Sequence, residues 1–472
     1  KDYMLENSST SYKAALWLAG EHGISQIPLV REDASLGQIN LMALNNREIA
    51  GGRSSYEVIN QFLPETGERE RRFDVSLLIN GIPLIHIELK NPDHPYMDAF
   101  RQIQNYCREG QFRSLFGFVQ MFVVSNEAET RYIAANTTGA MGEKFLTRWV
   151  DEDNQTVNSC LEFAKAALNI PMAHLMIGRY SVIDETNKRQ VLLRPYQIHA
   201  ISKIREASKE NKSGYVWHTT GSGKTLTSYT VTKNLLDIPS IDKAIFLIDR
   251  RDLDKQTSDS FQSYAHNDDV DVDKTESTKD LENKLCNKEK TAIVTTIQKM
   301  QNIIRKCSAK NLSESIAKLK KQLQSKRLAF VIDECHRTVS PQTKRELDNF
   351  FGSFEHPCLW YGFTGTPIFA ENQREMLGDL PRTTLKLYER ELHKYTIKEA
   401  LHDGAVLGFQ IQSLGNGLES LQELARENKL FSEEKFSQCP RRNWKMPLLA
   451  IMKRMAKVCT AILLIAKRLL IT

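Results

Sequence analysis

The sequence lacks the features that define several large classes of protein. Its eight cysteines form no C-x-x-C pair and no metal-binding spacing, which argues against a zinc module and against a disulfide framework. No signal-peptide pattern is visible, and the longest late apolar run, 458–466, is too short to span a bilayer. We find no internal repeat. These absences predict reduced thiols, a cytoplasmic location and no membrane partner.

The charge balance is also without an extreme. Lys and Arg total 64 and Asp and Glu total 58, which gives a net charge of +6 over 472 residues. This mild basic excess is compatible with a polyanionic partner but does not by itself indicate one. The length leaves room for two to four domains, and the composition is that of an ordinary globular protein.

What is present is organised around residues 216–225, which read V-W-H-T-T-G-S-G-K-T. A β-prone run enters a glycine-rich loop and a helical pattern leaves it, as in a phosphate-binding loop whose backbone N–H groups surround a β-phosphate. Lys224 is expected to bridge the β- and γ-phosphates, and Thr225 to offer its hydroxyl to Mg²⁺. The strict motif has glycine where His218 stands, so this is the helicase-type variant. Both flanks disfavour the alternative, a chance glycine-rich turn before a helix. The predicted nucleotide ligands in the loop are Thr220, Gly221, Ser222, Gly223, Lys224 and Thr225.

A second informative stretch covers residues 72–90, where two β-rich runs flank Asn80-Gly81, a strong hairpin signal. A two-residue loop would pair Asp74 with Ile87 and would mix polar and apolar side chains on both faces. A three-residue loop, 80–82, pairs Asp74 with Glu88 instead, and we predict this register. One face of the hairpin would then be wholly apolar, comprising Phe73, Val75, Leu77, Ile79, Pro83, Ile85, Ile87 and Leu89.

The polar face of that hairpin predicts a metal-dependent nuclease site. Asp74 and Glu88 would hold one divalent cation between the two strands. Lys90, on the same face, would position the attacking water or stabilise the pentacovalent phosphate. The spacing resembles the PD-(D/E)xK nuclease superfamily, here as Asp74 followed by Glu88-Leu89-Lys90. On its own, the pattern fits a solvated ion pair on a strand equally well.

The helix that follows favours the nuclease interpretation. Within the helical pattern from Met97 to Gly110, Gln102 and Tyr106 are four residues apart and therefore share a helix face. A Gln-x-x-x-Tyr helix after a Glu-x-Lys strand resembles the RecB-like branch of these nucleases. The alternative, a surface glutamine beside a half-buried tyrosine, loses weight in this context.

Residues on either side of the phosphate loop predict the rest of an ATP site. Gln197, some twenty residues upstream, is expected to read the adenine edge with its amide. After a buried apolar run, Asp333 would hold the Mg²⁺ of ATP through water, and Glu334 would orient the hydrolytic water. Thr364-Gly365-Thr366 ends a further strand, and His336 is expected to couple the acidic pair to it.

These patterns together predict an α/β protein in which a PD-(D/E)xK nuclease domain precedes a RecA-like, parallel-sheet helicase lobe. Apolar runs that begin at residues 243, 292, 328 and 359 supply the parallel strands. The expected ranges are 1–165 for the nuclease domain (core about 45–140), 166–190 for a linker, 191–412 for the helicase lobe and 413–472 for a divergent basic tail. Within the tail, 448–470 would form an amphipathic helix that packs on the helicase lobe, or would remain poorly ordered. Residues 1 to about 45 are expected to be short helices and loops, and 264–290 an exposed excursion.

The order of these motifs is similar to that of superfamily 2 helicases, and its combination with an N-terminal nuclease resembles the restriction (motor) subunit of type I restriction–modification enzymes. Further matches are H-T-T-G-S-G-K-T-L-T-S, D-R-R-D-L-D-K-Q-T at 249–257 and Y-T-I-K-E-A-L-H-D-G-A-V-L-G-F at 395–409. The resemblance covers about residues 45–410. It implies ATP- and Mg²⁺-dependent translocation on double-stranded DNA followed by cleavage, in complex with methyltransferase and specificity subunits. Cys335 stands where the family more often has alanine.

The sequence departs from that family at its end. Helicase motors use two RecA-like lobes, the second of which donates arginines to the γ-phosphate. About a hundred residues follow Pro367 without a Gln-x-x-Gly-Arg-x-x-Arg pattern, and residues 440–472 hold eight Lys or Arg and no Asp or Glu. We therefore expect a subunit that is truncated, frameshifted or trimmed after its first lobe, and that binds ATP but hydrolyses it slowly without moving DNA.

Two other classes of protein stay open at this point. A different nuclease–helicase, such as a repair enzyme, would not be stimulated by methyltransferase partners. A non-catalytic remnant, which only binds DNA or the partner subunits, would keep the geometry of the nuclease site and cleave nothing.

Overall fold

The computed structural model describes residues 2–31, 35, 37–49, 52–64, 69–136, 141–249, 255–267, 272–376 and 378–406. All of these residues belong to the first of two units, Lys1–Leu407, and the second unit is Gly408–Thr472. The predictions for the basic tail, 413–472, and for the middle of the 249–257 match therefore lie outside the described residues.

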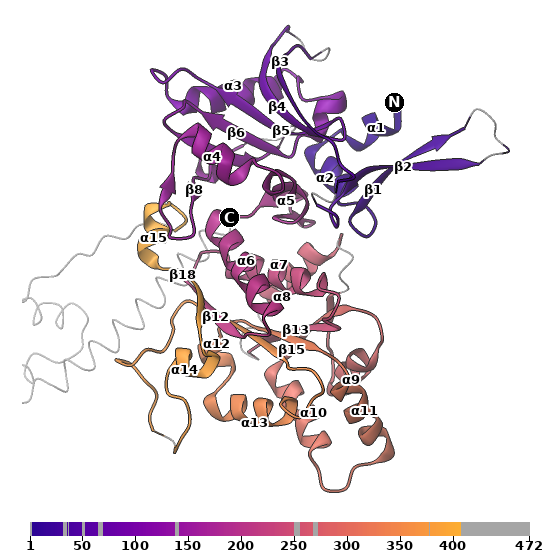
Figure 1. Cartoon of the computed structure of the whole chain (residues 1–472), viewed down its shortest axis with the longest axis vertical. Helices are drawn as coiled ribbons and strands as arrows, with labels where there is room; N and C mark the ends of the chain where they lie inside the picture. The colour runs from indigo at the N-terminus through magenta and orange to yellow at the C-terminus, as the bar shows by residue number, and fades with distance from the viewer. Residues whose placement is uncertain are drawn as a thin grey trace, which may run out of the picture. The chain divides into compact units, whose positions relative to one another are not determined.

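The N-terminal part of the chain is built on a mixed five-stranded sheet (Figure 1). Its elements are α1 (Asp2–Asn7), α2 (Ser11–Ala19), β1 (Ile24–Val30), β2 (Gln38–Asn45), β3 (Tyr56–Phe62), β4 (Phe73–Ile79), β5 (Ile82–Leu89), α3 (Tyr96–Arg108), the 3₁₀ helix η2 (Ser114–Phe118), β6 (Met121–Ser125), β7 (Thr130–Ala134), the 3₁₀ helix η3 (Glu143–Phe145), β8 (Trp149–Val150) and β9 (Thr156–Val157). The sheet order is β3-β4-β5-β6-β7, in which only β5 and β6 are parallel neighbours. A parallel pair needs a crossover connection, and α3 supplies it while packing on both strands.

The first 45 residues differ in part from the prediction. The expected short helices are present as α1 and α2. The segment expected to be loops forms instead an antiparallel ribbon of β1 and β2, in which Ile27 faces Leu41 and Leu29 faces Ile39 (Figure 1). Aliphatic residues that alternate along both strands share one face of the ribbon, and this alternation is the sequence signal for the two strands.

The hairpin of β4 and β5 corrects the predicted loop. The strands are joined by the two-residue loop Asn80-Gly81, because Ile79 pairs directly with Ile82, so the three-residue loop is wrong. A β-bulge then leaves Leu84 out of the pairing and shifts the register, so that Val75 faces Ile87. The bulge restores the register that side-chain alternation requires. Asp74 therefore lies across the hairpin from Glu88, as predicted, although the loop is one residue shorter than expected.

The face of the hairpin expected to be wholly apolar is only partly so. Its central residues pack into the main core of this part of the chain, as predicted (Val75, Leu77, Ile85 and Ile87). Phe73 lies instead in the cluster beneath α3, Pro83 faces Leu78, and Leu89 is exposed. Phe73 and Leu89 are the terminal residues of their strands and Pro83 lies beyond the bulge, so the alternation does not govern these three positions.

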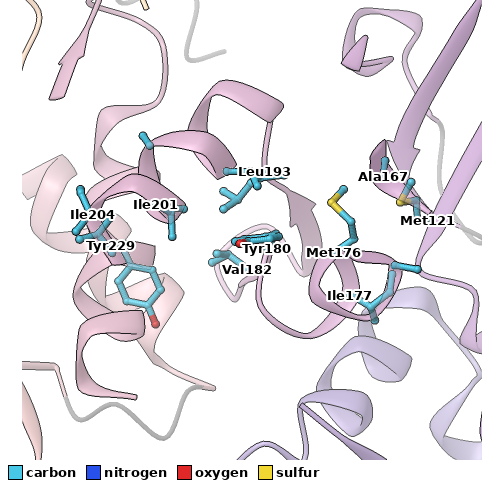
Figure 2. Close-up of a cluster of buried hydrophobic side chains, with 14 of the residues drawn as sticks. Met121, Ala167, Met176, Ile177, Tyr180, Val182, Leu193, Ile201, Ile204 and Tyr229 are labelled. Carbon is cyan, nitrogen blue, oxygen red and sulfur yellow. The ribbon is translucent and has the colours of Figure 1, made fainter. Parts of the chain in front are cut away.

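The segment between the two sheets is packed structure, although most of it was expected to be a linker. It contains α4 (Cys160–Ala167), α5 (Met172–Gly178), β10 (Ser181–Asp184) and β11 (Arg189–Leu192), and the two strands pair antiparallel. Figure 2 shows buried side chains of this connector, such as Met176 and Tyr180, in one hydrophobic cluster with Met121 of β6 and with Ile201 and Tyr229 of the next part of the chain. The connector therefore shares its core with the elements that precede and follow it.

The remaining described residues form a parallel α/β lobe (Figure 1). Its elements are α6 (Pro195–Lys209), β12 (Gly214–His218), α7 (Lys224–Leu236), β13 (Lys243–Ile248), α8 (Lys255–Ala265), β14 (Val272–Lys274), α9 (Thr278–Cys286), β15 (Thr291–Thr296), α10 (Ile297–Cys307), α11 (Glu314–Gln324), β16 (Leu328–Ile332), α12 (Cys335–Thr338), α13 (Pro341–Phe351), β17 (Leu359–Thr364), α14 (Thr384–Tyr388), β18 (Glu391–Tyr395) and α15 (Ile397–His402). The seven-stranded sheet has the order β14-β15-β13-β16-β17-β12-β18, and every pair in it is parallel. The predicted α/β class and the parallel lobe are confirmed.

Both faces of the parallel sheet are covered, which explains the unbroken apolar runs. Along β13, Phe246 and Ile248 face the cluster that includes α7, whereas Ile245 and Leu247 face the cluster that includes α10. Two strands are not among those predicted. One is β14, which pairs with β15 and lies, with the helix α9, in the segment expected to be an exposed excursion. The other is β18, which pairs with β12 at the opposite edge of the sheet.

Two further properties concern all of the residues that the structure describes. No helix there has both the length and the apolar composition needed to cross a membrane. The described residues include six cysteines, and all of them are free thiols: Cys107, Cys160, Cys286, Cys307, Cys335 and Cys358.

Candidate active sites

Two strands and one helix bring the predicted nuclease residues together. Asp74 on β4 and Glu88 on β5 lie close enough for the negative charge of Asp74 to raise the pKa of the Glu88 carboxyl group. Lys90 Nζ lies 3.5 Å from Glu88 Oε1 and donates to Gln102 Oε1 of α3. Gln102 Nε2 donates in turn to the hydroxyl of Tyr106. The five side chains therefore form one connected group.

Burial sets the electrostatics of this group. Glu88 is fully buried, and its Oε1 accepts no hydrogen bond from any described residue, although Lys90 lies beside it. Burial first, and the negative charge of Asp74 second, raise the pKa of Glu88 to about 8. Asp74 is partly exposed and accepts a hydrogen bond from the backbone N–H of Leu89 at 2.9 Å. A buried carboxylate oxygen that makes no hydrogen bond has lone pairs left to coordinate a cation.

The donor set also indicates which cation fits. Carboxylate oxygens suit a hard ion such as Mg²⁺, which keeps several of its waters and commonly takes only one or two protein carboxylates. No group of three or more His, Cys, Asp and Glu side chains that could hold a metal occurs in the described ranges. The pair of Asp74 and Glu88 therefore matches Mg²⁺ better than it matches a structural zinc site.

The metal-free protein is expected to lose stability as the pH rises from about 4.5 to about 8. Glu88 has a pKa of about 8 in the folded state, against 4.5 for an ordinary glutamate. Between these values the folded state keeps a proton that the unfolded state has released, so the free energy of unfolding falls with each pH unit. Thermal melts in a chelator, for the wild type and for Glu88→Gln, measure this contribution. A melting-temperature difference between the two proteins that stays constant from about pH 5 to about pH 8 would contradict it.

A further polar pair lies on this face and is absent from the predicted site residues. His86 is fully buried, with Nε2 3.3 Å from Glu88 Oε2 and Nδ1 3.1 Å from Ser76 Oγ. Ser76 faces His86 across the hairpin. The signal for this pair is present in the sequence, because the register that places Asp74 beside Glu88 also places Ser76 beside His86.

The phosphate loop lies at the C-terminal end of β12, the end at which parallel sheets bind ligands. β12 ends at His218, and α7 begins at Lys224 with Gly223 as its N-cap. Gly221 and Gly223 have φ angles of +86° and +78°, in the left-handed region that favours glycine. Thr220 is exposed, and Thr225 is half-buried in the first turn of α7. The loop therefore presents backbone N–H groups at a helix N-terminus, as a phosphate requires.

Helix α6 holds the loop from one side. The hydroxyl of Tyr196 donates to the carbonyl of Ser222 at 2.6 Å, a contact that was not predicted. Gln197 is buried, its Nε2 lies 3.1 Å from Thr227 Oγ1, and its Oε1 accepts from the N–H of Arg194. The amide of Gln197 thus binds the protein itself here, and adenine recognition by this residue stays a prediction.

The acidic pair lies against the loop. Lys224 Nζ is 3.2 Å from Glu334 Oε1. Asp333 follows directly after β16, and one of its carboxylate oxygens accepts from the N–H of Glu334 at 2.9 Å. Glu334 has a φ of +42°, a left-handed conformation that is uncommon for glutamate and that often marks functional sites. Lys224, Asp333 and Glu334 therefore meet at one edge of the sheet.

His336 connects the acidic pair with the strand end at Thr364. Its Nδ1 lies 2.8 Å from Thr364 Oγ1 and 3.6 Å from Glu334 Oε2, and its Nε2 lies 3.1 Å from Thr366 Oγ1. Burial lowers the pKa of His336, so the ring is neutral at physiological pH. The contact expected between the two motifs is present.

The edge strand β18 also supports the loop. His218, which replaces the usual glycine, has Nε2 2.9 Å from Nδ1 of His393 on β18, and both rings are buried. The backbone N–H of Thr219 donates to the carbonyl of Tyr395. The loop is therefore fixed by a strand whose histidine lies 175 residues later in the chain, beyond the reach of local sequence patterns.

Comparison with known proteins finds relatives for both parts of the chain. The family model "SWI2/SNF2 ATPase" matches residues 196–434, and the model "Type I restriction enzyme R protein N terminus" matches residues 27–140. The type I restriction enzyme SsaAORF53P endonuclease subunit of Staphylococcus saprophyticus is 37% identical over 387 residues, which are 82% of this chain and 39% of that relative. The C-terminal part of the putative type I restriction enzyme MpnIIP endonuclease subunit of Mycoplasma pneumoniae is 35% identical over 218 residues, which are 43% of this chain and 100% of that relative.

Solved structures show more distant likeness. The ATP-dependent Type ISP restriction–modification enzyme LlaBIII bound to DNA is 19% identical and has a TM-score of 0.30, with 46% of this chain and 16% of that chain covered. Of the relatives compared by sequence, the staphylococcal subunit is longer than the matched region: the chain spans 39% of its length.

Proposed function

Because the chain belongs to the family of type I restriction enzyme endonuclease subunits, we propose that it is the ATP-dependent endonuclease subunit of such an enzyme. The N-terminal domain would be a PD-(D/E)xK nuclease that cleaves double-stranded DNA, and the parallel-sheet lobe would bind Mg·ATP as the first of the two lobes that a translocation motor uses. The observation that carries the nuclease assignment is the grouping of Asp74 and Lys90 around the buried carboxylate of Glu88, whose Oε1 lies 3.5 Å from Lys90 Nζ and makes no hydrogen bond with a described residue. The partners would be DNA and the methyltransferase and specificity subunits.

In the nuclease domain, Asp74 and Glu88 would hold the cation. When bound, Mg²⁺ supplies Lewis-acid stabilisation of the phosphate and lowers the pKa of water. Lys90 would place its ammonium group against the attacking water or a phosphate oxygen. Gln102 orients that ammonium group, and Tyr106 fixes Gln102 in turn. The chain's own contribution is therefore a preorganised cationic group beside two carboxylates.

In the parallel-sheet lobe, ATP would compete with one internal ion pair. Lys224 would leave Glu334 and bind the β- and γ-phosphates, while the N–H groups of the loop surround the β-phosphate. Thr225 and Asp333 are placed to hold Mg²⁺, Thr225 through its hydroxyl and Asp333 through water. Once released from Lys224, Glu334 would be free to orient the hydrolytic water. Gln197 would read the adenine edge.

Lys224→Ala is expected to weaken Mg·ATP binding about 10- to 100-fold. Hydrogen bonds between charged groups contribute roughly 1.5–3 kcal/mol each, which corresponds to that range. Titration with a fluorescent ATP analogue measures the dissociation constant. The matched control is Lys290→Ala, because Lys290 lies in the same lobe and, among the described residues, donates to the carbonyls of Ile238 and Pro239 and not to the phosphate loop. Unchanged affinity in Lys224→Ala would show that the loop does not bind the phosphates.

A cleavage assay with the assembled complex tests the function as a whole. The chain is combined with methyltransferase and specificity subunits and incubated with plasmid DNA, Mg²⁺ and ATP. We expect cleavage that requires all of these components. Cleavage that is independent of the methyltransferase and specificity subunits would favour a repair nuclease–helicase. A complex that assembles and binds DNA but cleaves nothing would favour a non-catalytic remnant.

A further inference from the structure

We propose that His86, held in place by Ser76, is a positioning residue that orients Glu88 for the divalent cation. The inference rests on the proposed nuclease function and assigns roles to two side chains beyond the five predicted nuclease residues. Three observations carry it. His86 contacts one oxygen of Glu88, the other oxygen lies 3.5 Å from Lys90 Nζ without a hydrogen bond to any described residue, and aromatic side chains pack around the His86 ring.

The two oxygens of Glu88 have different surroundings. Oε2 lies 3.3 Å from His86 Nε2. Oε1 lies on the side of Lys90, 3.5 Å from its Nζ, and accepts no hydrogen bond from the described residues. The terminal torsion of a glutamate is broad and does not fix the plane of the carboxylate by itself. An anchor at Oε2 therefore determines where Oε1 points.

The His86 ring is held on all sides. Ser76 Oγ lies 3.1 Å from Nδ1, and a hydroxyl can satisfy that nitrogen as donor or as acceptor. The ring packs against Phe73 at 4.6 Å and Phe112 at 5.3 Å between ring centres, and it has no exposed surface. A ring packed in this way cannot follow a rotating carboxylate, so it imposes its own orientation on Glu88. Partners of this kind typically change metal affinity about 10- to 100-fold when they are removed.

A purely structural role makes a different prediction. If His86 only filled space among aromatic rings, phenylalanine would replace it without any effect on the cation. If it positions Glu88, phenylalanine would keep the packing and lose the anchor. The two roles therefore separate when metal affinity and folding stability are measured on the same variants.

The experiment is calorimetric titration of the full chain with Mn²⁺ alone, together with thermal melting of the metal-free protein. In His86→Phe, we expect the dissociation constant for Mn²⁺ to rise about 10- to 100-fold. His86→Gln, whose amide can still donate to Glu88, should recover part of the affinity. The control is His174→Phe, because His174 is equally buried but contacts Tyr56 and Asn46 instead of Glu88.

Each outcome decides between the alternatives. Folded His86→Phe that binds Mn²⁺ with wild-type affinity overturns the positioning role, whatever its melting temperature. If His86→Phe does not fold, Ser76→Ala takes its place, with an expected loss of about two- to tenfold for one hydrogen bond; unchanged affinity there also overturns it. A wild-type chain that binds no Mn²⁺ would overturn the proposed nuclease site itself, which is a distinct result.

Discussion

Glu88→Gln or Asp74→Asn is expected to reduce Mg²⁺-dependent DNA cleavage about 10²- to 10⁴-fold. The range corresponds to the several kcal/mol of charge stabilisation that a bound metal ion supplies in a transition state. Both substitutions are isosteric. In Asp74→Asn the side-chain carbonyl can still accept from the N–H of Leu89, so the strand pairing should persist. Because the parallel-sheet lobe holds the phosphate loop separately, Mg·ATP binding should stay at the wild-type level.

The measurement is the initial rate of plasmid linearisation by the assembled complex, with ATP-analogue titration on the same preparations. Asp98→Asn is the control, because Asp98 lies on the neighbouring helix α3 and pairs with Arg101 at 3.0 Å. That variant should cleave DNA at the wild-type rate. Wild-type cleavage by Glu88→Gln would remove the carboxylate pair from the mechanism and place the nuclease site elsewhere.

The β4–β5 hairpin shows how far sequence patterns lead and where they stop. The turn signal at Asn80-Gly81 indicates a two-residue loop, whereas side-chain alternation requires Asp74 opposite Glu88. Both signals are correct, because a bulge at Leu84 reconciles them. The hydrophobic pattern does not show the bulge, since Leu84 lies within a continuous apolar run; its one local signal is Pro83, which has no backbone N–H to donate within the sheet. The alternation of polar and apolar residues cannot reveal one inserted residue when the residues around it are all apolar.

The parallel lobe was predictable to the extent that its strands are buried on both faces. β13, β15, β16 and β17 are central strands with apolar centres, and the sequence predicts them together with β12, the central strand that enters the phosphate loop. β14 and β18 are the two edges of the sheet, where one side of the strand lacks a neighbour and polar residues are tolerated. The support that His393 gives to the phosphate loop therefore could not be predicted, because its strand was not.

The connector fails as a predicted linker for a different physical reason. Its helices are short, and α5 has only seven residues, so their apolar periodicity is weak. Their burial depends on partners such as Met121 and Tyr229 that lie far away in the sequence in either direction (Figure 2). Local patterns predict elements that bury a face of their own, and they miss segments that fill a gap between two other elements.

Glu334→Gln is expected to reduce ATP hydrolysis about 10²- to 10⁴-fold, the usual contribution of a general base, without loss of ATP binding. In the structure, Glu334 Oε1 lies 3.2 Å from Lys224 Nζ, and Oε2 lies 3.6 Å from Nδ1 of His336. A neutral glutamine would hold Lys224 less strongly, so the phosphates would meet weaker competition for that ammonium group. The variant should therefore bind Mg·ATP at least as tightly as the wild type.

Single-turnover hydrolysis with the protein in excess over ATP, in the presence of duplex DNA, resolves this difference even if the wild-type rate is slow. Glu314→Gln is the control, because Glu314 is an exposed carboxylate on α11 of the same lobe. Two roles for Glu334 then give opposite patterns. If Glu334 orients the hydrolytic water, the Glu334→Gln variant hydrolyses ATP more slowly and binds Mg·ATP as tightly as the wild type. If Glu334 only restrains Lys224, the variant binds Mg·ATP more tightly and hydrolyses ATP at the wild-type rate. That second pattern would contradict the assignment of Glu334 to the chemical step.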